Sequence, residues 1–206
     1  IQGNESICIF VSNEYLTNML HDNIFSCELL PSKDGYTFTI VSQLGPMLHE
    51  AERSFGQRNK DYTILGIELA DIKQPQIWFP GDCRHIIIQL TEDCINDMDK
   101  ALFQLAHETI HCLEPNKYGS TTVLEEGLAT YFSMNYNGIN DDSVIDLEPY
   151  KLAYHNVKRL LKYDDMIILK ARTLEPNLSL ITADMLHRLC PSIDKKLAQE
   201  LTRMFA

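Results

Sequence analysis

The chain has 206 residues, 45% of them hydrophobic, and a net charge of −11 at pH 7. This length suits one domain with a complete hydrophobic core, which we expect to span residues 1–206. The acidic charge argues against nucleic acid and anionic membrane surfaces as partners, because both require clustered lysine and arginine side chains. No apolar stretch reaches the length of a transmembrane helix, so we expect no membrane contact.

Secondary structure is expected to change in kind along the chain. Runs of β-branched and apolar residues predict strands at 6–12, 36–42, 63–69, 76–79 and 84–90. Apolar residues at helical spacing predict helices at 14–21 and 46–58, and helices throughout from Asp97 onward. Strands first and helices afterwards predict an α+β fold, with a sheet-containing half at 1–95 and a helical half at 96–206.

The most informative motif is an HExxH run, in which His107 is the first residue and His111 the last. Apolar residues recur at helical spacing from 98 to 113, which predicts an amphipathic helix through the motif. Residues four apart lie on one face of a helix, so both histidines can bind one metal ion. Glu108 lies beside them, placed to accept a proton from a water on that metal. A polar stripe on a surface helix is the alternative, and the apolar flanks argue against it.

A second helix, predicted at 123–132, follows the histidines after a loop and carries two adjacent carboxylates, Glu125 and Glu126. A catalytic zinc site needs three protein ligands and one open position, so one of these carboxylates can complete the set. We therefore expect Zn²⁺ as the cofactor. Iron(II) is the alternative, because two histidines and a carboxylate also suit that ion.

The two motifs together resemble those of the gluzincin metallopeptidases, the thermolysin-like group that includes the aminopeptidase N family. In aminopeptidase N-like enzymes the third zinc ligand is the glutamate before glycine in a run similar to Leu-Asn-Glu-Gly-Phe-Ala. Residues 124–129 read Leu-Glu-Glu-Gly-Leu-Ala, which implies Glu126 as the ligand and leaves Glu125 as the alternative. The resemblance covers residues 86–161 and implies a zincin-like catalytic domain with a mixed sheet beside the histidine helix.

Two neighbouring features bear on this resemblance. Thr130 stands where thermolysin has an aspartate that orients a ligand histidine, so the groups behind the ligands must differ here. The strand at 84–90 occupies the place of a gluzincin edge strand that pairs with extended substrates. Its three consecutive isoleucines, residues 86–88, equally predict a buried strand.

Aromatic residues open a third predicted helix, with Pro149 in its first turn. Aminopeptidase N-like enzymes place a tyrosine near the start of a similar helix, where it stabilises the transition state. Tyr150 aligns best with it and is implied as the hydrogen-bond donor to the developing oxyanion. Tyr154 and His155 are the alternatives for this role. Packing of both tyrosines against the core is the structural alternative.

The resemblance implies a zinc metallopeptidase that acts on a peptide or protein, with Glu108 as general base and Tyr150 as oxyanion donor. The chain lacks the Gly-x-Met-Glu-Asn run that holds the free amine of the substrate in aminopeptidase N-like enzymes, and Gly66-Ile67-Glu68 is the nearest run. We therefore do not expect a general aminopeptidase. The alternative function is a regulatory or partner-binding metalloprotein whose zinc site is structural and turns over little.

Cysteine usage bears on the compartment. Six cysteines are present, none forms a CxxC pair, and most lie in apolar segments. This favours free thiols in a reducing compartment over disulfides in a secreted protein. The first residues do not resemble a signal peptide, so we expect a cytoplasmic protein. Cys112, directly after His111, is interpreted as a packing residue of the helix.

Overall fold

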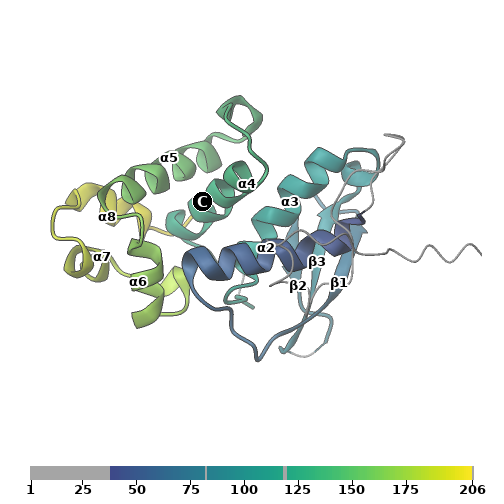
Figure 1. The fold of residues 1–206 in the computed structure, drawn as a ribbon, viewed down its shortest axis with the longest axis horizontal. Coiled ribbons are helices and arrows are strands. Elements are labelled where there is room, and N and C mark those ends of the chain that lie inside the picture. Colours follow the sequence, from purple (N-terminus) through teal and green to yellow (C-terminus); the bar gives the residue numbers. More distant parts are fainter. Residues whose placement is uncertain (1–37, 82, 118–119, 206) are drawn as a thin grey trace, which may run out of the picture.

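The computed structural model describes residues 38–81, 83–117 and 120–205, and its helices and strands carry the labels of Figure 1. The strand expected at 6–12 and the helix expected at 14–21 lie outside the described residues. The first two residues of the strand expected at 36–42 also lie outside them.

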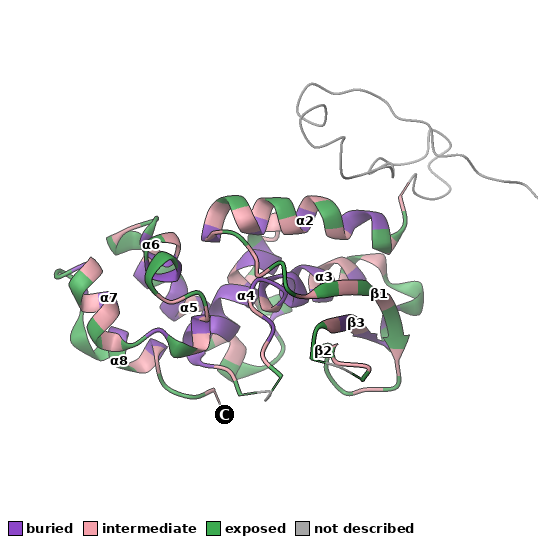
Figure 2. Cartoon of the chain, turned by 90° about the horizontal axis from the view of Figure 1, so that it is seen from below, coloured by how far each residue is buried: buried purple, intermediate pink, exposed green. Residues whose placement is uncertain are grey.

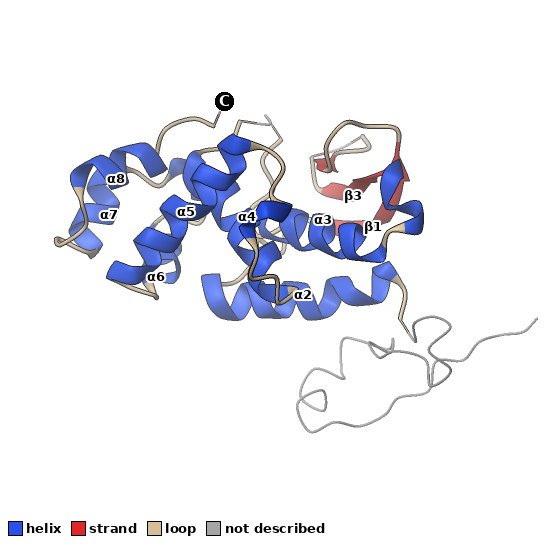
Figure 3. Cartoon of the chain, turned by 90° about the horizontal axis from the view of Figure 1, so that it is seen from above, coloured by secondary structure: helices blue, strands red, loops and turns tan. Residues whose placement is uncertain are grey.

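A three-stranded mixed sheet forms one end of the described structure (Figure 3). Its strands are β1 (Thr63–Ala70), β2 (Gln76–Trp78) and β3 (His85–Thr91), close to the expected bounds. β3 is the central strand, parallel to β1 and antiparallel to β2. The prediction that 84–90 is a substrate-binding edge strand is therefore wrong. Ile86 and Ile88 are fully buried, which confirms the alternative of a buried strand.

Helix α2 (Ile40–Phe55) replaces the described part of the strand expected at 36–42. The side chain of Thr39 accepts a hydrogen bond from Ser42 N, and Ser42 Oγ accepts one from Thr39 N. This capping box begins a helix where alternating threonine and apolar residues had predicted a strand, so that prediction is wrong. The helix expected at 46–58 therefore begins six residues earlier, and Pro46 lies inside it.

The rest of the described chain is mostly helical, which confirms the expected α+β fold with a mostly helical C-terminal half. The helices are α3 (Met98–His111), α4 (Val123–Tyr136), α5 (Glu148–Tyr163), α6 (Ile167–Leu174), α7 (Ala183–Leu189) and α8 (Lys195–Leu201). Short 3₁₀ turns are η1 (Glu92–Asn96), η2 (Asp142–Val144) and η3 (Leu178–Leu180). Among the described helices, none combines the length and apolar composition needed to cross a membrane.

Helices α2 and α3 lie against the sheet, and α4 and α5 extend the helical layer away from it (Figures 1 and 2). Most of their buried apolar residues join in one cluster, while Met134 of α4 and Tyr154 of α5 belong to a smaller second one. The larger cluster runs from Ile88 in β3 through Leu105 in α3 and Leu128 in α4 to Leu201 in α8. Burial is therefore greatest along α3 and α4, the two helices that carry the predicted metal ligands (Figure 2).

Arg172 joins three helices from a buried position in α6. Its side chain donates hydrogen bonds to backbone carbonyls of Phe55, Gly56, Gln57, Leu113 and Pro176. Phe55 is the last residue of α2, and Gly56 and Gln57 follow it. Leu113 lies just beyond the end of α3, and Pro176 lies just beyond the end of α6. Carbonyls at buried helix ends need donors, and here one guanidinium group bonds several of them, while Leu113 also accepts a hydrogen bond from Asn59 N.

Helix α4 passes so close to α5 that position 127 has no room for a side chain. A Cβ atom on Gly127 would lie 2.4 Å from the carbonyl oxygen of Ala153 and 2.8 Å from Val157 Cγ2. The nearest obstacle is backbone, which cannot rotate away as a side chain can. The observed distance between these two helices therefore requires glycine at this position.

We expect Gly127→Ala to lower the free energy of unfolding by about 2 kcal/mol or more, as measured by urea denaturation. The clash with α5 outweighs the roughly 1 kcal/mol that alanine gains over glycine in a helix. Gly66→Ala is the matched control, because no atom lies within 4 Å of a Cβ added there. Equal stability of Gly127→Ala and the wild type would contradict this account of the helix contact.

Candidate metal centre

Helix α3 places His107 and His111 on one face, one turn apart, as the HExxH spacing predicts. The centroids of their rings are 5.1 Å apart. The helix begins at a side-chain cap, in which Asp97 accepts a hydrogen bond from Lys100 N. His107 is only 8% exposed, so the pair lies in a largely dehydrated part of the structure.

Glu126, in the first turn of α4, faces both histidines. Its Oε2 lies 3.2 Å from His107 Nε2, and its Oε1 lies 3.7 Å from His111 Nε2. One ligand atom from each of the three residues lies within 4.8 Å of the other two. Around a tetrahedral zinc ion with bonds of about 2.1 Å, ligand atoms are about 3.4 Å apart. The three predicted ligands therefore converge at a spacing that fits a zinc ion.

The charges around this cluster favour a cation. Burial by itself would lower the pKa of His111, but the carboxylates of Glu126 and Glu125 raise it to about 10. Burial by itself would raise the pKa of Glu126, but the charge of His111 and the hydrogen bond with His107 hold it at about 2. Positive charge is thus stabilised at this point, and a metal cation can replace the proton there.

Glu108 lies beside the histidines with its side chain almost completely buried. Burial raises the pKa of its carboxyl group, although the charges of His111 and His107 oppose the rise. A carboxylate with a raised pKa accepts a proton more readily near neutral pH, as a general base must. Glu108 is not one of the three converging residues, and its role as a base stays a prediction.

Tyr150, in the first turn of α5, reaches the histidine cluster. Its ring lies edge-on to His107 with ring centroids 5.8 Å apart. Burial and the nearby carboxylates of Glu126 and Glu108 raise the pKa of its phenol. The hydroxyl group therefore remains protonated near neutral pH and can donate a hydrogen bond, the property required of an oxyanion donor.

The two alternatives for this role have other partners. The hydroxyl of Tyr154 accepts a hydrogen bond from Lys158 Nζ at 3.0 Å, and its ring lies near that of Tyr131. His155 Nε2 lies 3.0 Å from Asp142 Oδ2 at the surface. Of the three candidates, Tyr150 is the one whose ring contacts a predicted ligand.

Glu125 takes a position that the sequence did not predict. Its Oε1 lies 2.8 Å from His111 Nδ1, and its Oε2 accepts a hydrogen bond from Ser179 Oγ. Thr130 stands where thermolysin has the orienting aspartate. Its hydroxyl instead donates a hydrogen bond to the backbone carbonyl of Glu126. The carboxylate that contacts the predicted ligand His111 at Nδ1 therefore comes from one residue before Glu126 rather than from one turn after it.

Phe205 is a second neighbour of the site that sequence reasoning missed. Its ring centroid lies 4.8 Å from that of Tyr150. Its backbone N–H donates to the carbonyl of Thr121, and Val123 N donates to the carbonyl of Arg203, so this segment runs alongside the entry to α4. A phenylalanine and a serine so far from the motifs carry no sequence signal that could have placed them here.

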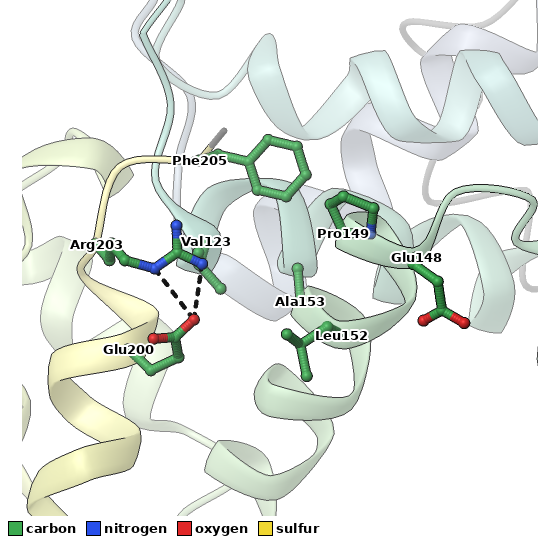
Figure 4. A pocket seen from close by; sticks show the side chains of 8 residues that line it. All are labelled: Val123, Glu148, Pro149, Leu152, Ala153, Glu200, Arg203 and Phe205. Carbon is green, nitrogen blue, oxygen red and sulfur yellow. Dashed lines mark hydrogen bonds and ion pairs between the residues drawn. The ribbon is translucent and has the colours of Figure 1, made fainter.

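A pocket of about 350 Å³ opens beside the start of α5 (Figure 4). Its lining residues are Val123, Glu148, Pro149, Leu152, Ala153, Glu200, Arg203 and Phe205. The guanidinium of Arg203 donates a hydrogen bond to Glu200 within this lining. None of the three converging residues lines the pocket. One of its lining residues, Phe205, also contacts Tyr150 beside the candidate metal centre.

The described cysteines are free thiols: Cys83, Cys94, Cys112 and Cys190. Cys112 is buried directly after His111, and burial raises the pKa of its thiol. A neutral, buried thiol outside the converging cluster fits the predicted packing role. Cys8 and Cys27 lie outside the described residues.

No family model matches this chain, and neither does any curated protein or solved structure. The chemistry of the site is therefore inferred from its own residues and their geometry.

We expect the wild-type chain, purified without added metal, to contain one zinc ion per molecule. His107→Ala removes one of three ligands and should abolish stoichiometric zinc binding, as measured by inductively coupled plasma mass spectrometry. His49→Ala, at an exposed position of α2, is the control and should keep the metal. Unchanged zinc content in His107→Ala would show that the metal binds elsewhere.

Proposed function

We propose that this chain is a zinc-dependent peptidase whose site is similar to that of the gluzincins. The convergence of His107, His111 and Glu126 is the observation that carries the proposal. A bound zinc ion would supply a Lewis acid and a water molecule with a lowered pKa. The remaining requirements of peptide hydrolysis are a proton acceptor and a donor to the oxyanion, and two further residues of the chain suit these roles.

Glu108 suits the movement of the proton. Its carboxyl group is buried beside the histidines, and its raised pKa favours proton uptake. In the proposed reaction it accepts the proton that the attacking water loses and delivers it to the nitrogen of the departing amine. The same carboxyl group is regenerated after each turnover.

Tyr150 suits the stabilisation of charge. When a nucleophile adds to a peptide carbonyl, negative charge develops on the carbonyl oxygen. The phenol of Tyr150 is a protonated donor, and its ring lies against His107, one of the ligands. A hydrogen bond from this hydroxyl to the oxygen would strengthen as the charge develops, which lowers the barrier.

An endopeptidase, or a peptidase for one protein partner, suits the chain better than a general aminopeptidase. Glu68, in the run nearest to an amine-binding motif, accepts a hydrogen bond from Gln89 at 2.6 Å on the exposed face of the sheet. Gln89 in turn accepts one from Gln76. These three side chains form a surface ladder, so Glu68 is engaged there rather than at the histidines.

A regulatory metalloprotein is the second candidate, and burial of the site is the observation that favours it. Glu108 and Glu126 are 2% and 7% exposed, which restricts the approach of a substrate. In such a protein, zinc would hold α3 and α4 together, and binding of a partner would replace turnover. Digestion of a mixed peptide library separates the two functions, because only a peptidase releases products.

We expect Glu108→Gln to keep zinc and to lower the rate of peptide hydrolysis by about two to four orders of magnitude, the usual contribution of a general base. Glutamine preserves the size of the side chain but cannot accept the proton. Glu92→Gln, at an exposed position of η1, is the control. If the zinc-loaded wild type cleaves no peptide in the library, the regulatory function is favoured; equal activity of Glu108→Gln would exclude this base.

Tyr150→Phe removes only the phenol hydroxyl. We expect kcat to fall by about 10²–10³-fold with little change in KM or zinc content, because the lost hydrogen bond forms mainly in the transition state. Tyr154→Phe should retain kcat, since that hydroxyl is bonded to Lys158. Steady-state kinetics on one cleaved peptide measures both variants, and the opposite ranking would assign the role to Tyr154.

A further inference from the structure

Glu125 lies behind His111 rather than among the converging ligand atoms. It contacts Nδ1 of the ring at 2.8 Å, whereas Glu126 faces Nε2 of the same ring. The two nitrogens of an imidazole point in different directions. Glu125, which is bonded to Nδ1, therefore cannot also reach a metal ion that is bound at Nε2 of His111. Its role must be other than that of a metal ligand.

Both carboxylate oxygens of Glu125 have partners. Oε1 faces His111, and Oε2 accepts the hydroxyl proton of Ser179. The hydroxyl oxygen of Ser179 in turn accepts a hydrogen bond from the backbone N–H of Thr122 at 3.2 Å. A serine hydroxyl has one proton, so this second bond leaves that proton for Glu125. Glu125 is 3% exposed, and the carboxylate is thus held in one orientation with little competition from water.

Ser179 is itself held in place by its own turn. It lies in η3, where the side chain of Asn177 accepts a hydrogen bond from Ser179 N at 2.9 Å. Leu178, the preceding residue, is buried in the apolar core. The hydroxyl of Ser179 is therefore held in a fixed position beside α4. Through Glu125, it connects η3, in the last third of the sequence, to His111 on α3.

We propose that Ser179 and Glu125 are positioning residues that hold His111 with its proton on Nδ1 and with Nε2 directed at the metal ion. The inference rests on the proposed zinc site and deepens it by assigning two residues that do not touch the metal. A neutral histidine carries one ring proton, and Glu125 can accept it only from Nδ1. Ligand histidines commonly donate their second N–H in this way, and loss of the acceptor weakens metal binding about 10–100-fold.

Zinc affinity, measured on the full chain by competition with a chromophoric chelator, tests the inference. We expect the zinc dissociation constant to rise about 10–100-fold in Glu125→Gln and about tenfold in Ser179→Ala. Ser179→Thr keeps a hydroxyl at this position, and its affinity should stay within about threefold of the wild type. Ser133→Ala is the matched control, because it removes a buried hydroxyl on α4. That hydroxyl donates a hydrogen bond to the backbone carbonyl of Ala129.

Nitrogen NMR of the zinc-loaded chain, labelled with ¹⁵N-histidine, adds a readout that a purely structural role would not move. In the wild type, His111 should show a proton on Nδ1 that exchanges slowly with water. In Glu125→Gln and Ser179→Ala, this signal should shift and exchange faster, while the signals of His49 stay unchanged. Thermal unfolding of each metal-free variant shows whether it has folded.

The outcomes separate this inference from the zinc site itself. Zinc binding by the wild type, with equal affinity in Glu125→Gln and Ser179→Ala, would overturn the positioning roles and leave the proposed function standing. An equal loss of affinity in Ser133→Ala would also overturn them, because general destabilisation would then explain the effect. A wild-type chain that binds no zinc would overturn both proposals.

Discussion

Helix α4 is in contact with a helix on each side, and the whole site depends on that arrangement. Toward α3 it presents Glu126, which meets both histidines. Toward α5 it presents Gly127, whose missing side chain lets the two backbones meet at Ala153. Helix α5 then brings Tyr150 against His107. Two adjacent residues of one helix, a glutamate and a glycine, therefore set the position of the predicted ligands and of the phenol together.

Burial and charge act together in the cluster. Glu108, Glu125 and Glu126 are all buried around two histidines. Buried carboxylates cost folding energy unless cations or donors balance them, and without a metal ion the proton on His111 supplies that balance. A divalent cation would balance more of this negative charge than a proton does. Because an ion that binds only the folded chain stabilises it, the proposed metal site would link metal occupancy to folding stability.

The sequence predicted those features that depend on local spacing. Two histidines four apart share a helix face whatever surrounds them, and Glu126 follows in a short, specific run. The contact between Ser179 and Glu125 spans 54 positions, and a serine in a turn carries no pattern that could have revealed it. The helix start at Thr39 was missed because this capping residue also belongs to the alternation of threonine with apolar residues that predicted a strand. The central place of β3 depends on pairing partners, which a single strand does not encode.

Arg172 makes α6 part of the same cooperative unit as the histidine helix. Its guanidinium bonds carbonyls at the end of α2 and just beyond the end of α3, across 59 positions of the chain in the case of Leu113. Detachment of α6 would remove the donor that Arg172 gives to the buried carbonyl of Phe55 and one of the two donors to that of Leu113, which also accepts Asn59 N, so protection from hydrogen exchange should be shared by the three helices. A protease that cut between α5 and α6 would leave His107, His111 and Glu126 on one fragment, yet that fragment would lose the contacts of Arg172 with the end of α2 and with Leu113, just beyond the histidine helix α3.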